Sequence, residues 1–420
     1  MEYIPRMLEH RLVAMLRQSP AVLVTGARQV GKSTLLRHLF PHRRYLSLDD
    51  PFLEQQAREN GDMLLTLNPP PVTIDEVQYA PELFRHLKIR CDESGEPGLF
   101  CMTGSQQFQL MRNVTETLAG RVSIFELSGL SLREIQGDLF ARHFLPTEDY
   151  IQERGKSARC PENLWNLIHR GSYPALQRHE VEWAAYYADY VRTYLERDVR
   201  QLSAVQNLDA FRRFLVATAA RTGAMLNYSN IADEIGKDVN TVKHWISILE
   251  ASGIVYLLEP YASTALKRAT KTPKLYFRDT GLACYLLRWL SPETLANGAA
   301  SGHLFETFVV SEILKSFSNE GLDYRFFVSY YRGHDKWKTR SADGEEIENE
   351  TEIDLIIEED GILHPIEIKK NAIIQPTAAA AFPVLDKVPE KRRGTGAVIC
   401  TCPAPGMLCE NLFQLPFWYV

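Results

Sequence analysis

The chain has 420 residues, a formal net charge of −6 and 45% hydrophobic residues. This composition suffices for several packed cores and argues against a uniformly basic nucleic-acid coat. No apolar run approaches the roughly 18 residues of a membrane span, and the first residues lack the apolar core of a secretion signal. We therefore expect a cytoplasmic protein with no membrane partner.

The first predicted elements surround a phosphate-binding loop. An amphipathic helix over residues 7–16 leads into a buried strand at 22–25, and a helical pattern follows the loop. Glycines let the backbone wrap a polyphosphate, the backbone N–H groups point at it, the lysine pairs with the β- and γ-phosphates, and the first hydroxyl binds Mg²⁺. A glycine turn that binds nothing is the alternative. The residues predicted to bind ATP and Mg²⁺ are Gly26, Ala27, Arg28, Gln29, Val30, Gly31, Lys32, Ser33 and Thr34.

Two acids follow the third predicted strand. Strands at 44–48 and 71–74 flank a predicted helix at 52–66, and the second of them ends in Asp75 and Glu76. In P-loop proteins the first acid holds Mg²⁺ through water, and the second orients or deprotonates the attacking water. The pair is therefore predicted to be catalytic, with an ordinary solvated strand end as the alternative.

Further polar residues follow the next strands. After a helix at 81–92, a strand at 99–102 ends in Thr103 and Ser105, which are predicted to read the γ-phosphate or else simply to end the strand. Arg121 opens a strand at 122–127. It is predicted to act as an arginine finger, in cis or across the interface of a homo-oligomer, and the alternative is a surface arginine.

These motifs resemble the AAA+ superfamily, specifically a bacterial and archaeal branch with a large C-terminal module of unknown function. The resemblance implies an α/β P-loop AAA+ core over 1–130 and a helical lid over 131–205, interrupted by a polar connector at 142–162. It also implies an arginine that senses nucleotide on a long helix at 183–202, where a solvated face is the alternative. The candidates are Arg192, Arg197 and Arg200. Later stretches that are similar to the branch lie at 170–174, 194–199, 279–282, 302–306 and 352–354.

Residues 206–290 are predicted to form a winged helix-turn-helix. A helix around 211–217, a short helix at 229–235 ended by Gly236, a third helix capped by Asp238 and a strand at 253–258 follow in that order. The module is predicted to bind DNA, and a protein-binding or inter-domain module is the alternative. Predicted groove contacts are Asn240, Thr241, Lys243, His244 and Ser247, and predicted phosphate contacts are Lys267, Arg268, Lys271 and Lys274.

Residues 291–420 carry an acidic constellation. A helix at 304–314 places Glu306 on an apolar face, and a hairpin turning at 360–361 brings Asp354 beside Glu367 and Lys369. This pattern resembles the restriction-endonuclease-like PD-(D/E)XK fold, in which the acids bind Mg²⁺ and the lysine assists the attacking water. A half-exposed hairpin is the alternative, and nuclease activity is left open.

The seven cysteines follow no paired spacing, which is typical of reduced thiols. Cys400 and Cys402 are expected to be buried core thiols rather than a metal site with Cys409.

The leading prediction is a Mg²⁺-dependent AAA+ ATPase coupled to a DNA-directed winged-helix and nuclease-like module. The first alternative is a nucleotide-gated switch whose inactive nuclease-like domain recruits a protein or DNA partner. The second is a remodelling subunit that acts on protein. Metal-dependent cleavage and DNA-stimulated hydrolysis separate these hypotheses.

Overall fold

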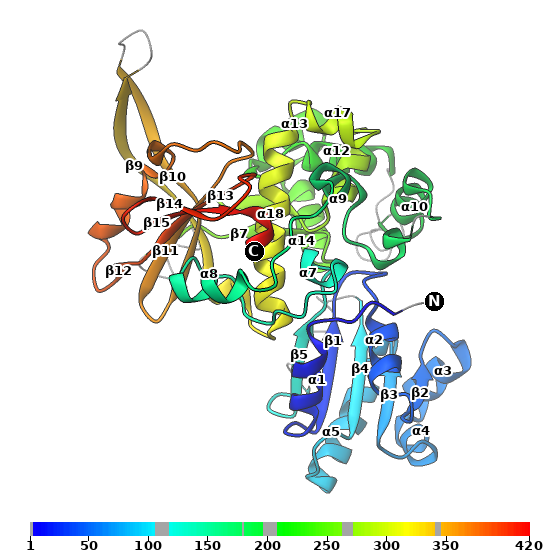
Figure 1. Cartoon of the computed structure of the whole chain (residues 1–420). Helices are drawn as coiled ribbons and strands as arrows, with labels where there is room; N and C mark the ends of the chain where they lie inside the picture. Colours follow the sequence, from blue (N-terminus) through cyan, green and yellow to red (C-terminus); the bar gives the residue numbers. More distant parts are fainter. Residues whose placement is uncertain (1–2, 106–116, 179, 196–207, 263–271, 341–345) are drawn as a thin grey trace.

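The structure is a computed structural model that describes residues 3–105, 117–178, 180–195, 208–262, 272–340 and 346–420 (Figure 1). The amino-terminal domain, in blue and cyan, is built on one sheet, and a second large sheet, in orange and red, is built from the last part of the chain. The helix α18 (Ser301–Asn319) runs between them. Within the described ranges, no helix is both long and apolar enough to cross a membrane.

The amino-terminal sheet has five strands in the order β2-β3-β4-β1-β5, and every pairing is parallel. Its central strands are buried on both faces, so they read as continuous apolar runs in the sequence. The strands are β1 (Ala21–Thr25), β2 (Arg44–Ser47), β3 (Val72–Asp75), β4 (Phe100–Gly104) and β5 (Val122–Glu126).

The helices of this domain agree with the predicted pattern except at one position. The helix predicted at 52–66 is two helices, because the backbone leaves the helical region at Asn60 (φ −140°, ψ 51°). Gly61 packs so closely against His86 that a Cβ there would lie 2.6 Å from the imidazole. The helices are α1 (Glu9–Leu16), α2 (Lys32–Leu39), α3 (Pro51–Glu59), α4 (Gly61–Leu67) and α5 (Leu83–Ser94).

Residues 131–195 contain short helices that differ from the prediction in two places. The predicted polar connector holds the helix α8, whose first turn is capped by the Thr147 hydroxyl. The predicted long helix consists of α10 followed by a π-helical turn at Val191–Leu195, and its remainder lies outside the described residues. The helices are α7 (Leu132–Ile135), α8 (Glu148–Arg154), α9 (Leu164–Arg170) and α10 (Trp183–Tyr190).

The segment around α8 packs against the last residues of the chain. Arg154 Nη2 donates to the carbonyl of Trp418 at 3.0 Å, and the Tyr150 hydroxyl donates to that of Tyr419 at 2.9 Å. Arg133 Nε donates to the carbonyl of Val420 at 3.1 Å. This part of the predicted lid therefore lies against the C-terminal residues.

The next module combines three helices with a three-stranded antiparallel sheet in the order β6-β8-β7. The second helix ends at Gly236 in the left-handed conformation, and Asp238 caps the third, both as predicted. The function of this module as a winged helix-turn-helix stays a prediction. Its elements are α12 (Leu208–Ala219), β6 (Ala224–Met225), α13 (Tyr228–Ile235), α14 (Val239–Ala251), β7 (Val255–Leu258) and β8 (Lys274–Phe277).

The C-terminal sheet is mixed, with the order β14-β15-β13-β11-β10-β9 and β12 paired beside β11. The predicted hairpin is present, because β10 and β11 pair antiparallel with Leu355 opposite Ile366. The strands are β9 (Val328–Arg340), β10 (Glu346–Glu359), β11 (Ile362–Ile368), β12 (Arg392–Arg393), β13 (Gly396–Cys400), β14 (Gly406–Cys409) and β15 (Leu412–Pro416). Two shorter helices, α16 (Thr280–Leu286) and α17 (Pro292–Ala296), precede α18.

The helix α18 is buried along most of its length. Its polar side chains bind the segment that follows the amino-terminal sheet: Glu312 accepts from Leu132 N at 2.7 Å, and Lys315 donates to the Leu130 carbonyl at 3.0 Å. Because distant segments supply the hydrogen-bond partners of these buried groups, the helix packs against several parts of the chain at once.

Candidate functional site

The predicted phosphate-binding loop lies between β1 and α2, at the carboxyl edge of the parallel sheet. The strand β1 sits between β4 and β5, where the strand order reverses, and ligands of parallel sheets bind at such a point. Gly26 and Gly31 have φ values of 145° and 98°. A Cβ on Gly26 would come within 2.2 Å of the Leu127 carbonyl oxygen, so this position requires glycine.

The remaining loop residues keep a compact turn. Lys32 is 5% exposed, and its Nζ donates to the carbonyl oxygens of Gly26 at 3.0 Å and Ala27 at 2.8 Å. Val30 is buried, Arg28 is half-buried, and Gln29 and Thr34 are exposed. The lysine ammonium therefore lies against the loop backbone, at the position predicted for phosphate binding.

The structure brings the predicted hydroxyl and the first acid together. Ser33 Oγ donates to Asp75 Oδ1 at 2.8 Å, and Thr103 donates a hydrogen bond to the same carboxylate. A hydroxyl beside a carboxylate supplies the hard oxygen donors that suit Mg²⁺. Asp75 is 5% exposed, so these donors replace the water that burial removes from its carboxylate.

The second acid is held at the end of β3. Glu76 has φ 54°, its backbone N–H donates to Thr103 Oγ1 at 3.1 Å, and its carboxylate accepts from Ser105 Oγ at 3.0 Å. Gln78 Nε2 also donates to this carboxylate and to Ser105 Oγ. Thr103 and Ser105 thus position the acid pair, and contact between them and a γ-phosphate stays a prediction.

Tyr45 and Gln78 belong to this site and were not identified from the sequence. The Tyr45 hydroxyl donates to Asp75 from the neighbouring strand β2, and Arg37 lies 3.9 Å from the centre of the Tyr45 ring. Burial, and then the hydrogen bond to Asp75, raise the pKa of Tyr45, so the phenol remains a donor. Only the strand order could have placed Tyr45 here, whereas Gln78 follows Glu76 closely enough to be a local candidate.

Arg121 lies at the opposite end of the sheet from the P-loop. Its carbonyl accepts from Ala21 N, at the start of β1, whereas the P-loop follows Thr25 at the end of that strand. At about 3.3 Å per residue the two ends are about 15 Å apart. Arg121 pairs with Asp92, with Nη2 3.0 Å from Oδ2. It therefore lies too far away to act in cis, and a role across a subunit interface stays a prediction.

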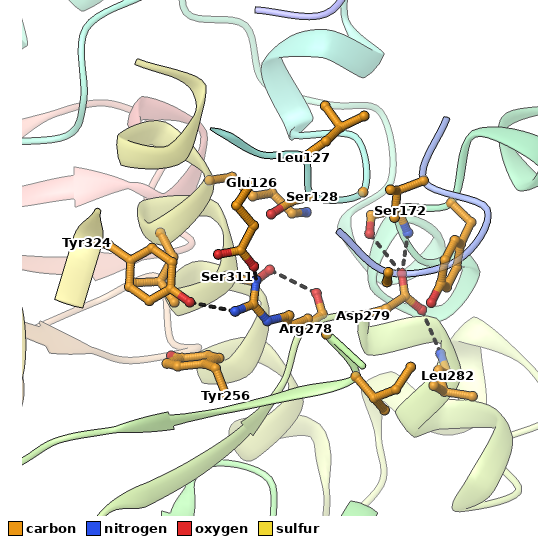
Figure 2. Close-up of a pocket in the computed structure, with 18 residues that line it drawn as sticks. Glu126, Leu127, Ser128, Ser172, Tyr256, Arg278, Asp279, Leu282, Ser311 and Tyr324 are labelled. Carbon is orange, nitrogen blue, oxygen red and sulfur yellow. Dashed lines mark hydrogen bonds and ion pairs between the residues drawn. The ribbon is translucent and has the colours of Figure 1, made fainter. Parts of the chain in front are cut away.

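A junction connects the P-loop with later parts of the chain (Figure 2). Ala27 and Val30 line a cavity of about 30 Å³ together with Glu126, Ser172, Tyr256, Arg278, Asp279, Ser311 and Tyr324. Arg278, which follows β8, forms an ion pair with Glu126 at the end of β5 and also donates to the Tyr324 hydroxyl. Burial lowers the pKa of Arg278, but the charge and hydrogen bond of Glu126 together with the neighbouring Tyr324 and Tyr256 outweigh it, so that its pKa is raised.

Asp279 organises the other side of this junction. Its carboxylate accepts from Ser172 N at 2.7 Å, Ser172 Oγ at 2.8 Å, Leu282 N at 2.7 Å and the Tyr187 hydroxyl at 2.6 Å. These hydrogen bonds join two of the stretches that are similar to the AAA+ branch, residues 170–174 and residues 279–282.

The P-loop also touches the three-helix module directly. Gly253 has φ 70°, and a Cβ there would lie 3.3 Å from Ala27. Arg6, which no sequence motif marks, holds the other side of the loop: its Nη1 donates to the Val30 carbonyl at 2.9 Å, and its Nε pairs with Glu134 at 3.0 Å. The P-loop is therefore enclosed by Arg6 on one side and by Gly253 of the three-helix module on the other.

A second candidate site lies in the C-terminal sheet. The hairpin brings Asp354 beside β11, where it accepts from Ile368 N at 2.9 Å. Lys369 Nζ lies 2.5 Å from Glu367, and the Tyr276 hydroxyl donates to Glu306 at 2.6 Å. We call Glu306, Glu352, Asp354 and Glu367 the acidic pocket.

Lys274 lies inside this pocket, contrary to its prediction as a phosphate contact. Its Nζ is 2.5 Å from Glu352, 3.5 Å from Asp354 and 3.6 Å from Glu306, and its side chain is 3% exposed. The prediction was wrong because Lys274 is the first residue of the strand β8 and not part of a loop, and its side chain points into the protein. In the described part of the chain, no group of three or more His, Cys, Asp or Glu side chains is arranged to hold a metal ion.

Burial and the neighbouring charges shift the pKa of several groups in the acidic pocket. Burial, and then the charge of Asp354, raise the pKa of Glu306 to about 7 and that of Glu367 to about 8. Burial lowers the pKa of Lys274, but the charges of Glu306 and Asp354 outweigh it, so that its pKa is raised. The lysine stays charged, and its positive charge is offset by several neighbouring carboxyl groups together.

Other predicted residues are placed as follows. On α14, Asn240, Lys243, His244 and Ser247 are exposed and Thr241 is half-buried, whereas Lys267, Arg268 and Lys271 lie outside the described residues. Arg192 is exposed, and Arg197 and Arg200 lie outside the described residues. Cys400 and Cys402 are buried, as expected, and Cys409 is exposed.

The loop, the parallel sheet and the acid pair define a P-loop domain. Residues 18–136 match the family model described as an AAA domain, so this part of the chain is similar to AAA-type P-loop ATPase domains. Residues 161–293 and 301–418 match models described as domains of unknown function (DUF8612 and DUF4143).

Two mycobacterial relatives match most of the chain. Uncharacterized proteins Rv2008c of Mycobacterium tuberculosis and Mb2031c of Mycobacterium bovis are each 29% identical over 86% of this chain and 73% of their own. Among solved structures, the Walker-type ATPase PABY2304 of Pyrococcus abyssi is 16% identical, with a TM-score of 0.39 over 66% of this chain and 94% of its own. A RuvB variant of Thermotoga maritima is 16% identical, with a TM-score of 0.29 over 59% of this chain and 88% of its own.

Proposed function

We propose that the protein is a Mg²⁺-dependent ATPase of the AAA type. The observation that carries the proposal is the Ser33–Asp75 hydrogen bond of 2.8 Å at the P-loop, with Glu76 at the next position and the Lys32 ammonium against the loop. The residues fit both groups: positive-φ glycines leave room for phosphates, and the hydroxyl–carboxylate pair suits Mg²⁺.

Each residue has a role in this proposal. Lys32 would pair with the β- and γ-phosphates, and Ser33 and Asp75 would hold Mg²⁺, which when bound neutralises charge on the phosphate oxygens. Glu76 would orient the attacking water or accept its proton. Ser105 and Gln78, which hold the Glu76 carboxylate, would fix the direction in which it accepts.

Two substitutions test these roles. Lys32→Ala should abolish ATP binding in isothermal titration. Glu76→Gln should keep binding but lower turnover by about 10²–10⁴-fold, since a positioned general base contributes that much. Glu82→Gln, at an exposed glutamate of the same domain, is the matched control and should behave like wild type. Equal turnover in Glu76→Gln and wild type would refute the assignment.

We further propose that ATP turnover is coupled to a DNA-directed module. Two observations support this: the polar face of α14 is open to a partner, and Gly253, which follows α14, touches Ala27 of the P-loop. Nucleotide binding can therefore act on this module through direct packing. Single-stranded, duplex and branched DNA should stimulate turnover, whereas stimulation by a protein alone would favour a protein partner or remodelling substrate.

The second candidate function is a nucleotide-gated switch whose nuclease-like domain does not cut. One observation favours it: Lys274 places an ammonium among the carboxylates that would bind metal in a nuclease. On this hypothesis the wild type leaves plasmid and branched DNA intact with Mg²⁺ or Mn²⁺, while ATP turnover still responds to DNA or a protein. Cleavage that Asp354→Asn abolishes would restore the nuclease hypothesis.

A further inference from the structure

Lys274 is a buried cation surrounded by carboxylates from other elements. Its Nζ has oxygens of Glu352, Asp354 and Glu306 within 3.6 Å, and only 3% of its side chain is exposed. An ammonium at such depth persists only where charged partners offset its lost hydration. The acids thus determine where this side chain lies.

The lysine and the acids belong to different parts of the fold. Lys274 pairs with Met225 and Leu258 in the three-stranded sheet, whereas the acids lie on α18 and β10. Tyr330 of β9 joins the two parts: its backbone N–H donates to the Glu259 carbonyl at 3.1 Å, and its ring centre lies 5.6 Å from the ammonium. A shift of the three-stranded sheet relative to the C-terminal sheet would therefore move Lys274 within the pocket.

Lys274 Nζ occupies the point on which these carboxylates converge, and with the lysine there the acids are not arranged to hold a metal ion. Carboxylate oxygens from a helix and a strand converge on this point, and such hard donors suit Mg²⁺ and Mn²⁺. In this structure they stand 2.5–3.6 Å from nitrogen, which is wider than the ~2.1 Å that Mg²⁺ requires. The ammonium and a metal ion would compete for the same oxygens.

We propose that Lys274 is a built-in cation that keeps divalent metal ions out of the acidic pocket, so that metal binds there only when the lysine is withdrawn or removed. This device is separate from the P-loop and does not depend on ATP hydrolysis. It goes beyond the switch hypothesis, because it makes the position of Lys274 decide whether a divalent cation can bind to the acids.

Mn²⁺ binding to the full chain without nucleotide tests the proposal, with free Mn²⁺ followed by electron paramagnetic resonance. Lys274→Met removes the ammonium and keeps an unbranched side chain that is one atom shorter, and it should gain one Mn²⁺ site at least tenfold tighter than any site of the wild type. Lys274→Met combined with Asp354→Asn should lose that site. Lys274→Arg, which keeps the charge, should bind Mn²⁺ like the wild type.

Two results would overturn the proposal. The first is a wild-type Mn²⁺ site that Asp354→Asn alone removes, because the pocket would then accept metal with the lysine present; this measurement does not depend on any Lys274 variant. The second is a Lys274→Met protein that unfolds cooperatively in circular dichroism yet gains no site. Lys274→Gln replaces Lys274→Met in the same titration should the latter not fold. Neither result bears on ATP turnover, which belongs to the P-loop site and is measured separately.

Discussion

The ion pair between Arg278 and Glu126 joins the amino-terminal sheet to the segment after β8, and Arg278→Met removes it. The two side chains are 16% and 17% exposed. Breaking a fully buried pair costs about 3–5 kcal/mol, because the remaining charge is left without compensation. Here Arg325 lies 3.8 Å from Glu126 and some solvent remains. We therefore expect a loss of about 2–3 kcal/mol.

The double variant separates the pair from simple packing. Glu126→Gln alone strands the arginine, whereas Arg278→Met with Glu126→Gln strands no charge and should cost only about 1 kcal/mol. In calorimetry the first transition of Arg278→Met should fall by about 4–12 °C, at 2–4 °C per kcal/mol for a domain of this size class. The control Arg325→Met, at a side chain that is 53% exposed, should stay within about 0.5 kcal/mol of wild type. A double variant as unstable as the sum of both single variants would refute the reasoning.

Three further predictions concern the junction and α18. Gly253→Ala should weaken ATP affinity several-fold in isothermal titration, because its Cβ would press on the P-loop; Gly236→Ala, equally strained at φ 66° but facing open space, should bind ATP like wild type. Asp279→Asn should lower stability by about 2–3 kcal/mol in a thermal melt, since hydrogen bonds to a charged acceptor are lost. His143 lies 2.9 Å from Glu320 and 3.1 Å from Glu359, and although burial lowers its pKa, the hydrogen bonds and charges of the two carboxylates together outweigh burial and the pKa is raised. The protonated pair therefore stabilises the fold fully below pH ~6.5 and less as the pH rises through the folded pKa, so the melting advantage of wild type over His143→Gln should shrink from pH 6 to pH 8.

Local patterns were sufficient for the elements that carry the P-loop. The strand, the glycine-containing loop and the helix are adjacent in sequence, and Glu76 follows its strand directly, so each could be predicted without knowledge of the fold. The hairpin that places Asp354 beside Glu367 is local in the same sense. What these sites have in common is that few residues separate the groups that meet.

Other features depend on contacts between distant segments, which no periodicity reports. Lys274 follows a basic stretch and so resembled a phosphate contact, yet strand pairing turns it toward acids on α18 and β10. The helix α8 lies in a polar segment, yet its tyrosine packs against the rings of Phe140 and Phe144. Its arginine and tyrosine also bind backbone carbonyls of the last residues of the chain. Arg121 opens a strand as predicted, but the parallel order puts that end of the strand far from the P-loop.

The contacts between α8 and the last residues of the chain have a consequence for biosynthesis. Tyr150 precedes its partner Tyr419 by 269 residues, which at 5–20 residues per second takes a ribosome roughly 15–50 s. During that interval Arg133 and Arg154, which are both buried in the fold, have no carbonyl of residues 418–420 to bind. A nonsense mutation only a few codons before Trp418 should therefore be as damaging to expression as one in the middle of the gene.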